Sequence, residues 1–196
     1  MRKEIDDICY LESHPELCHL FKDAGYYKFC KKLQGSHQQV SEAFSLTFDG
    51  RKVVIGKDDF LVDEALIAEV TELPRTRENW FKTTVTKEVE FRSYLKPEHK
   101  CLIWKKDIPM SFLEEKWQHL LKSILVYITC EGRYNRVMIY HFKLMNHFTG
   151  RSPLNLLYYL HGILTNMPHQ VKAKPSKVAG RLSHHGLIKL LICELL

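Results

Sequence analysis

The chain has 196 residues, enough for one domain or two small ones, and its 45% hydrophobic content excludes a disordered chain. The formal net charge of +6 is unevenly spread, because residues 101–196 hold 13 Lys/Arg against 5 Asp/Glu while residues 1–100 hold 16 against 18. A basic half predicts attraction to an anionic partner such as nucleic acid; the alternative, which we favour because the charges are scattered, is a solvated basic surface.

Short helices are expected at the start of the chain. Apolar residues recur at helical spacing over 15–21 and 26–33, and Gly25 separates the two runs. A further helical turn could follow over 36–43. The charged beginning of the chain has no pattern of a secretion signal, so we expect an intracellular protein of the nucleus or cytoplasm.

A single small β-hairpin is expected over 44–55. Apolar and polar residues alternate from Phe44 to Phe48, and a second strand-like run ends at Ile55. Asp49-Gly50 lies between the two runs, where a tight turn needs positive φ. A helix over 60–73 is expected next, with Asp58 or Asp59 as its cap.

The spacing of apolar residues from Pro109 to Met167 predicts three consecutive helices. The first runs over 113–128, with Ser111 and Glu114 spaced as a capping box. The second runs over 135–148 and is apolar on most of its circumference, which is typical of a helix inside a bundle. The third is expected to start at Ser152-Pro153, because proline suits a first helical position.

The predicted fold class is therefore mainly α, a multi-helix bundle with one small hairpin. We interpret 1–196 as one helical domain, divided into 1–74, an irregular basic segment 75–110 and a helical core 111–196. An apolar helix over 187–196 stands at the end of the chain, so the sequence could be a fragment of a longer protein. Neither this helix nor any other apolar run reaches the ~20 residues of a membrane span.

No motif for catalysis, a cofactor or a metal is expected. Asp59 and Asp63 could share a helix face and bind a divalent ion, but acids in a first helical turn also complement the helix dipole, and we favour that interpretation. The spacings of cysteine and histidine match no zinc pattern, and glycine-rich phosphate loops are absent. Trp80-Phe81 among basic residues could contact nucleic acid or anchor a loop; we favour the anchor.

Basic residues of the second half are the candidate contacts for nucleic acid. They are Arg133, Arg136, Lys143, Arg151, Lys172, Lys174, Lys177 and Arg181. The alternative from another functional class is a protein–protein interaction module that uses an exposed apolar helix face, for example that of 187–196.

The order of apolar positions and turns resembles that of plant transposon or retroelement proteins. The stretches that carry the resemblance are Asp63-Glu64-Ala65-Leu66-Ile67 with Leu73-Pro74, Gly132-Arg133-Tyr134-Asn135, Asn155-Leu156-Leu157-Tyr158-Tyr159-Leu160 and His184-His185-Gly186-Leu187-Ile188. The resemblance implies an element-encoded or host-captured protein and gives no catalytic residues. We therefore expect a non-enzymatic binding or scaffold module of plant mobile-element origin.

Overall fold

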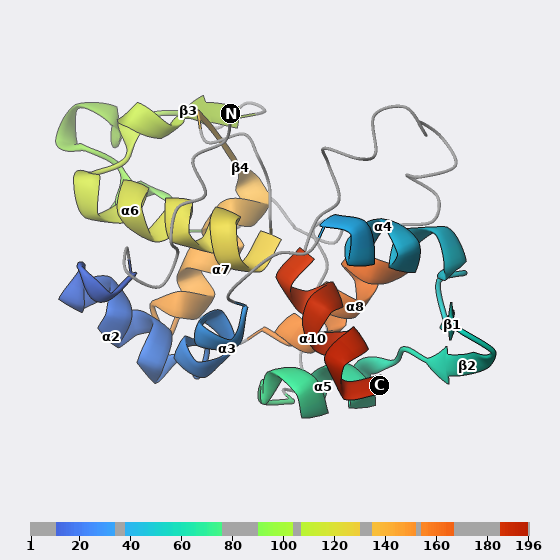
Figure 1. Ribbon diagram of the computed structural model, residues 1–196. Coiled ribbons are helices and arrows are strands. Elements are labelled where there is room, and N and C mark those ends of the chain that lie inside the picture. The colour runs from blue at the N-terminus through green and yellow to red at the C-terminus, as the bar shows by residue number, and fades with distance from the viewer. Residues whose placement is uncertain are drawn as a thin grey trace. The chain divides into compact units, whose positions relative to one another are not determined.

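The computed structural model shows a mainly helical chain with two small antiparallel sheets (Figure 1), which confirms the predicted fold class. It describes residues 11–33, 38–75, 90–103, 107–129, 135–151, 154–166 and 185–195. Two compact units are present, each discontinuous in sequence: Met1–Ala24 with Trp80–Leu154, and Gly25–Asn79 with Asn155–Leu196. The single domain predicted over 1–196 stays a prediction.

The first unit is built around α7. Its helices and strands are α2 (Pro15–Asp23), η2 (Arg92–Tyr94), η3 (Pro97–His99), β3 (Asp107–Pro109), η4 (Met110–Phe112), α6 (Glu115–Ile124), η5 (Leu125–Thr129), β4 (Arg136–Met138) and α7 (Ile139–Phe148). α7 contacts both α2 and α6. Phe21 of α2 packs on Phe148 of α7 with ring centroids 4.5 Å apart, and both side chains are buried.

The helix predicted over 135–148 starts later than expected. Residues 136–138 form β4, which pairs with β3 so that Val137 lies opposite Ile108, and both side chains are buried. Helix α7 begins only at Ile139, where the Met138 N–H donates to Nδ1 of His141 at 3.0 Å. The expected burial is confirmed for Phe142 and for most of the apolar side chains after it. This second sheet was not predicted, because three-residue strands are too short to show a periodicity.

The predicted capping box of Ser111 and Glu114 is wrong. Ser111 lies in the 3-10 turn η4, and Leu113 is extended and bridges Leu95. A helix capped at Ser111 would need Leu113 in its first turn, so α6 starts at Glu115 instead. The chain beyond Ile124 continues as one buried π-helical turn, η5, rather than as α-helix.

In the second unit the described residues form five helices and a hairpin. Their bounds are α3 (Tyr27–Lys32), α4 (Gln38–Thr47), β1 (Lys52–Ile55), β2 (Asp58–Leu61), α5 (Glu64–Thr71), α8 (Leu156–Thr165) and α10 (His185–Leu195). α5 contacts α3, α8 and α10, and α10 also contacts α4. Leu187, Ile188 and Leu191 of α10 are buried, whereas Leu190, Ile192 and Leu195 are half-buried. The use of an apolar face of this helix for protein–protein interaction stays a prediction.

The hairpin is present, but its predicted position over 44–55 is wrong. Residues 44–47 belong to α4, and the strands 52–55 and 58–61 turn at Gly56 with φ +67°. Phe44 and Phe48 stack at 5.0 Å, one helical turn apart, so these two rings follow the four-residue spacing of a helix and not the alternation of a strand. Asp49 stabilises a different turn, since its Oδ1 accepts the backbone N–H groups of Arg51 at 2.7 Å and of Lys52 at 2.6 Å.

The caps of α5 and α8 also differ from the expected ones. Asp58 and Asp59 lie in β2, and α5 is capped by Asp63, whose Oδ1 accepts the Leu66 N–H at 2.9 Å. α8 is capped by Asn155, whose Oδ1 accepts the Tyr158 N–H at 3.2 Å, and the expected start at 152–153 lies outside the described residues. Both true caps stand directly before their helices, as capping geometry requires.

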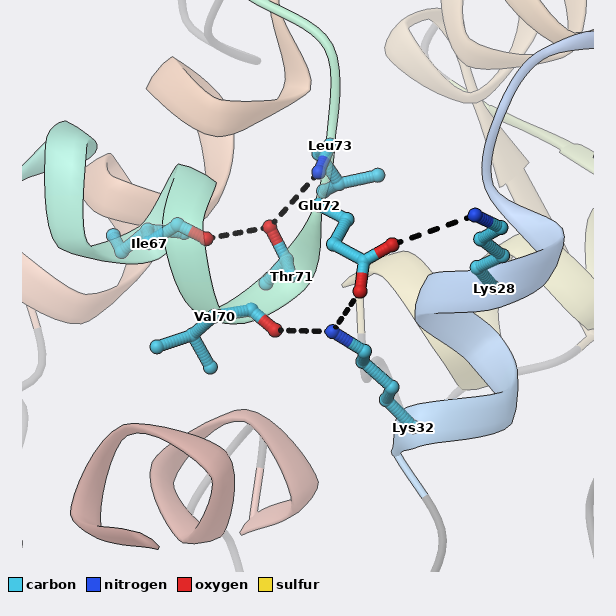
Figure 2. Close-up of polar contacts among 7 residues, drawn as sticks. All are labelled: Lys28, Lys32, Ile67, Val70, Thr71, Glu72 and Leu73. Carbon is cyan, nitrogen blue, oxygen red and sulfur yellow. Dashed lines mark hydrogen bonds and ion pairs between the residues drawn. The ribbon is translucent and has the colours of Figure 1, made fainter. Parts of the chain in front are cut away.

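The end of α5 is held by an ion-pair clamp to α3 (Figure 2). Glu72 has the left-handed backbone conformation (φ 57°, ψ 23°), which is uncommon for a side chain other than glycine. Its carboxylate lies 2.6 Å from Lys32 Nζ and 3.6 Å from Lys28 Nζ. Lys32 also donates to the Val70 carbonyl at 3.2 Å, so one ammonium satisfies both a helix-end carbonyl and the carboxylate.

Neutralising Glu72 is expected to destabilise the chain in a pH-dependent way. The hydrogen bond and charge of Lys32, and then the charge of Lys28, lower the pKa of Glu72 below its ordinary value of 4.5. The stabilisation is therefore present above the unfolded-state pKa and is lost as pH falls through the lower folded-state pKa. Urea unfolding should show Glu72→Gln less stable than the wild type at neutral pH and equal to it in acid. Glu69→Gln, an exposed acid of the same helix, should match the wild type at neutral pH; equal losses for both variants would contradict the clamp.

The revised cap of α5 gives a second stability prediction. Asp63→Ala removes the acceptor for the Leu66 N–H, so it should lower the free energy of unfolding by about 1 kcal/mol. Asp58→Ala, at an exposed strand residue, should change it by less than about 0.5 kcal/mol. If chemical denaturation shows a larger loss of stability for Asp58→Ala than for Asp63→Ala, the cap predicted from the sequence would be favoured instead.

Candidate functional site

Three of the eight predicted basic contacts lie in the described residues, all in the first unit. Arg136 is exposed on β4 and pairs with Asp107. Lys143 is half-buried on α7, and Arg151 is exposed just after that helix. The five others, namely Arg133, Lys172, Lys174, Lys177 and Arg181, lie outside the described residues.

The charge of the described residues is balanced. They hold 17 Lys/Arg and 17 Asp/Glu, whereas the whole chain holds 29 and 23. The net charge of +6 therefore belongs to the residues outside the described ranges. A basic contact surface within the described part must come from the local placement of cations and not from an overall excess.

The Tyr94 hydroxyl is at the centre of a side-chain network in the first unit. Its buried hydroxyl donates to Asn146 Oδ1 at 2.5 Å and lies 3.1 Å from Thr149 Oγ1. The Asn146 side-chain amide in turn donates to the Glu90 carbonyl at 3.2 Å. These bonds tie η2 to the end of α7. Burial raises the pKa of the Tyr94 hydroxyl above its ordinary value of 10.0, so the neutral donor is the form held in place.

Four aromatic rings pack into one group, here called the Tyr94 cluster: Phe91, Tyr94, Trp117 and Phe142. Tyr94 meets Trp117 edge to face at 5.0 Å and stacks on Phe142 at 5.8 Å. Phe91 lies 5.6 Å from Phe142. Because these rings come from η2, α6 and α7, the cluster joins three elements of the first unit, and each aromatic pair adds about 0.5–1.5 kcal/mol beyond area burial.

Three exposed cations lie over the rings of this cluster, and we call Arg92, Lys116 and Arg151 the basic rim. The Arg151 guanidinium carbon is 5.1 Å from the Tyr94 centroid, and Lys116 Nζ is 4.7 Å from that of Trp117. Arg92 lies 5.7 Å from the Phe91 centroid. Such contacts stabilise an exposed cation by roughly 0.5–1 kcal/mol, enough to restrict where its charge lies.

Two acids accompany the basic rim. Glu114 lies 3.8 Å from Lys116 Nζ, and Glu90 accepts the Ser93 N–H at 3.2 Å. Arg151 uses one N–H to donate to Ser93 Oγ at 2.6 Å, which leaves other guanidinium donors for a ligand.

This arrangement suits an anion. The Tyr94 and Phe142 rings are fully buried and offer no face on which a nucleobase could stack, whereas Trp117 is half-buried. The described residues contain no group of three or more His, Cys, Asp or Glu placed to hold a metal ion. What the rim presents is a set of guanidinium and ammonium donors, which match phosphate oxygens.

Sequence reasoning found Arg151 but missed Arg92, Lys116 and Tyr94. In the sequence, the signal for these residues is that a cation stands next to an aromatic residue, in Phe91-Arg92 and in Lys116-Trp117. Such neighbours are common in proteins, so they do not predict a binding site. The aromatic-basic pair singled out instead, Trp80-Phe81, lies outside the described residues.

Comparison with protein families, with curated proteins and with solved structures finds no match. No family is therefore shown for the chain, and the resemblance to mobile-element proteins stays a prediction.

Within the described ranges, no helix combines the length and the apolar character needed to cross a membrane.

Removing the Tyr94 hydroxyl is expected to loosen the cluster. Tyr94→Phe leaves Asn146 Oδ1 without its donor, so the free energy of unfolding should fall by about 1–2 kcal/mol. Because the folded-state pKa is raised, the hydroxyl stabilises the fold below the unfolded-state pKa, and this contribution is lost as pH rises through the folded-state pKa above 10.0. Tyr158→Phe, at a partly exposed ring, should be close to neutral in the same urea titrations. Equal losses for both tyrosines would contradict the anchoring role.

Proposed function

We propose that this protein is a non-enzymatic binding module of plant mobile-element origin that contacts the phosphate backbone of nucleic acid. The observation that carries the proposal is the basic rim, in which three exposed cations lie over the rings of one aromatic cluster. The resemblance of the sequence supports the origin, and the rim supports the ligand class.

Phosphate is the ligand that fits the rim best. Two of its three cations are arginines, whose planar guanidinium groups bind phosphate through two parallel N–H donors. Tyr94 beneath Arg151 and Phe91 beneath Arg92 are buried, and Trp117 beneath Lys116 is half-buried, so the cations are the groups that the rim presents most fully. Contacts to phosphate fix position but carry no sequence information, and the proposed binding is therefore independent of sequence and strongly dependent on salt.

The charge outside the described residues supports the same proposal. Residues 167–184 contain Lys172, Lys174, Lys177 and Arg181 and no acidic residue. A run of cations without acids adds phosphate contacts by releasing counterions from nucleic acid. The rim and this basic run are thus two separable contributors to one salt-dependent interaction.

The alternative function, protein–protein interaction through an exposed apolar helix face, has less support. In the described helices the exposed large apolar side chains are Leu46 of α4 and Tyr158 of α8, on different helices. Isolated exposed apolar residues are normal on a protein surface and do not make an interface.

The proposal predicts binding whose salt dependence the rim controls. Fluorescence anisotropy with a labelled DNA duplex of arbitrary sequence should show affinity falling steeply between about 50 and 200 mM salt. The triple variant Arg92→Gln, Lys116→Gln, Arg151→Gln should weaken binding to every sequence tested. It should also reduce the slope of log affinity against log salt by roughly 3, about one for each lost phosphate contact.

A charge-matched variant separates the rim from general electrostatics. Arg51, Lys57 and Arg75 are exposed in the second unit. Changing all three to Gln removes two arginines and one lysine, as the rim variant does, but at other positions. This control should keep most of the affinity. Changing the four cations of 167–184 to Gln measures that segment alone. No binding at low salt, or equal losses for the rim variant and the control, would overturn the proposal.

A further inference from the structure

Ser93 adjoins two residues of the basic rim, since it follows Arg92 in the chain and is hydrogen-bonded to Arg151. The proposed binding does not use it. It is exposed in η2, between Arg92 and Tyr94. Its backbone N–H donates to Glu90 Oε1 at 3.2 Å, and its Oγ accepts from Arg151 Nη1 at 2.6 Å. A hydroxyl that is both exposed and bonded to a guanidinium is placed for a modification that adds negative charge.

We propose that Ser93 is a phosphorylation site, and that its phosphate is held by Arg151 and closes the basic rim to nucleic acid. The second half of this proposal rests on the proposed function, whereas the capture of the phosphate by Arg151 does not. The site takes a phosphoryl group from a nucleoside triphosphate through a protein kinase.

The receiving guanidinium is already in place. The Arg151 backbone N–H donates to the Asn146 carbonyl at 2.8 Å, in the turn where Gly150 has φ +73°. The Arg151 side chain lies over the Tyr94 ring, which is itself fixed by Asn146 and Thr149. The charge is thus held by backbone and ring contacts, so little conformational freedom is lost when a phosphate binds there.

The chemical step is a balanced phosphoryl transfer. Ser93 Oγ forms a bond to the γ-phosphorus of ATP while the bond from that phosphorus to the β,γ-bridging oxygen breaks, and ADP leaves. The hydroxyl proton passes to the base of the kinase. The product carries a charge of about −1.5 to −2 at neutral pH and three strong acceptor oxygens.

The neighbouring charges decide whether this phosphate is retained at the rim. Arg151, which donates to Ser93 Oγ, attracts it, while the Glu90 carboxylate, bonded to the Ser93 N–H, repels it. Arg151 contacts the oxygen that would carry the phosphate and can donate a second hydrogen bond to the phosphate, so the dianion is favoured. The phosphate then offsets most of the positive charge of the rim, so nucleic-acid phosphates are attracted less.

The test uses the full chain with phosphoserine encoded at position 93. Phosphorus NMR should show the second pKa of this phosphate below its ordinary value of about 6, and Arg151→Gln should return it toward that value. Phosphoserine encoded at Ser13, an exposed residue of the same unit, is the matched control, and its pKa should not respond to Arg151→Gln. A phosphate pKa at position 93 that is the same with and without Arg151 would overturn the capture.

DNA binding by the same samples tests the switch. Phosphoserine at 93 should lower the affinity at least tenfold at low salt and reduce the salt slope by roughly 2, whereas phosphoserine at 13 should have a smaller effect. Equal effects at both positions would overturn the switch. If the unmodified chain binds no DNA but the pKa shift at 93 depends on Arg151, the proposed function fails and the phosphate site stands. Peptide mapping of the chain from eukaryotic cells should find phosphate on Ser93, and an unmodified Ser93 would count against the site.

Discussion

The hydrogen bond from the buried Tyr94 hydroxyl to Asn146 is the contact on which the first unit depends. It joins residues 52 positions apart and ties the short η2 turn to α7. A polar group buried this deeply must be satisfied, because an unpaired donor or acceptor costs about 1–3 kcal/mol. With the hydroxyl fixed, the ring becomes a rigid platform against which Trp117 and Phe142 pack.

The functional argument follows from that platform. A cation that lies over an aromatic ring keeps its outward N–H donors accessible, while the ring limits its movement. Arg151 and Lys116 therefore hold their charges at defined positions on the surface. The charge of the described residues is balanced, and placement therefore gives this surface its basic character. The same rigidity makes Ser93 a point of control, because a phosphate there meets a guanidinium that is already positioned.

Sequence periodicity predicted the helical class and most helix positions, since buried stripes such as those of α6 and α7 require residues three or four apart. Sequence periodicity gave a wrong prediction where the same residues fit two spacings. Phe44 and Phe48 fit both the alternation of a strand and the spacing of a helix, and in the structure they stack at the end of α4. The prediction of a helix cap at Ser111 was wrong, because Leu113 pairs with Leu95 in a β-bridge and has an extended backbone. The rim could not be predicted, because the rings beneath Arg92, Lys116 and Arg151 join one cluster only through the packing of η2, α6 and α7.

The central claim is that the cations over the Tyr94 cluster are the groups that touch nucleic-acid phosphate. It is tested most directly by following the side-chain Nε–H signals of the arginines by NMR while DNA is added to the full chain at low salt. The account predicts that the signals of Arg92 and Arg151 shift early and together, while those of Arg51 and Arg75 stay in place. Shifts at Arg51 and Arg75 with none at Arg92 and Arg151 would contradict it.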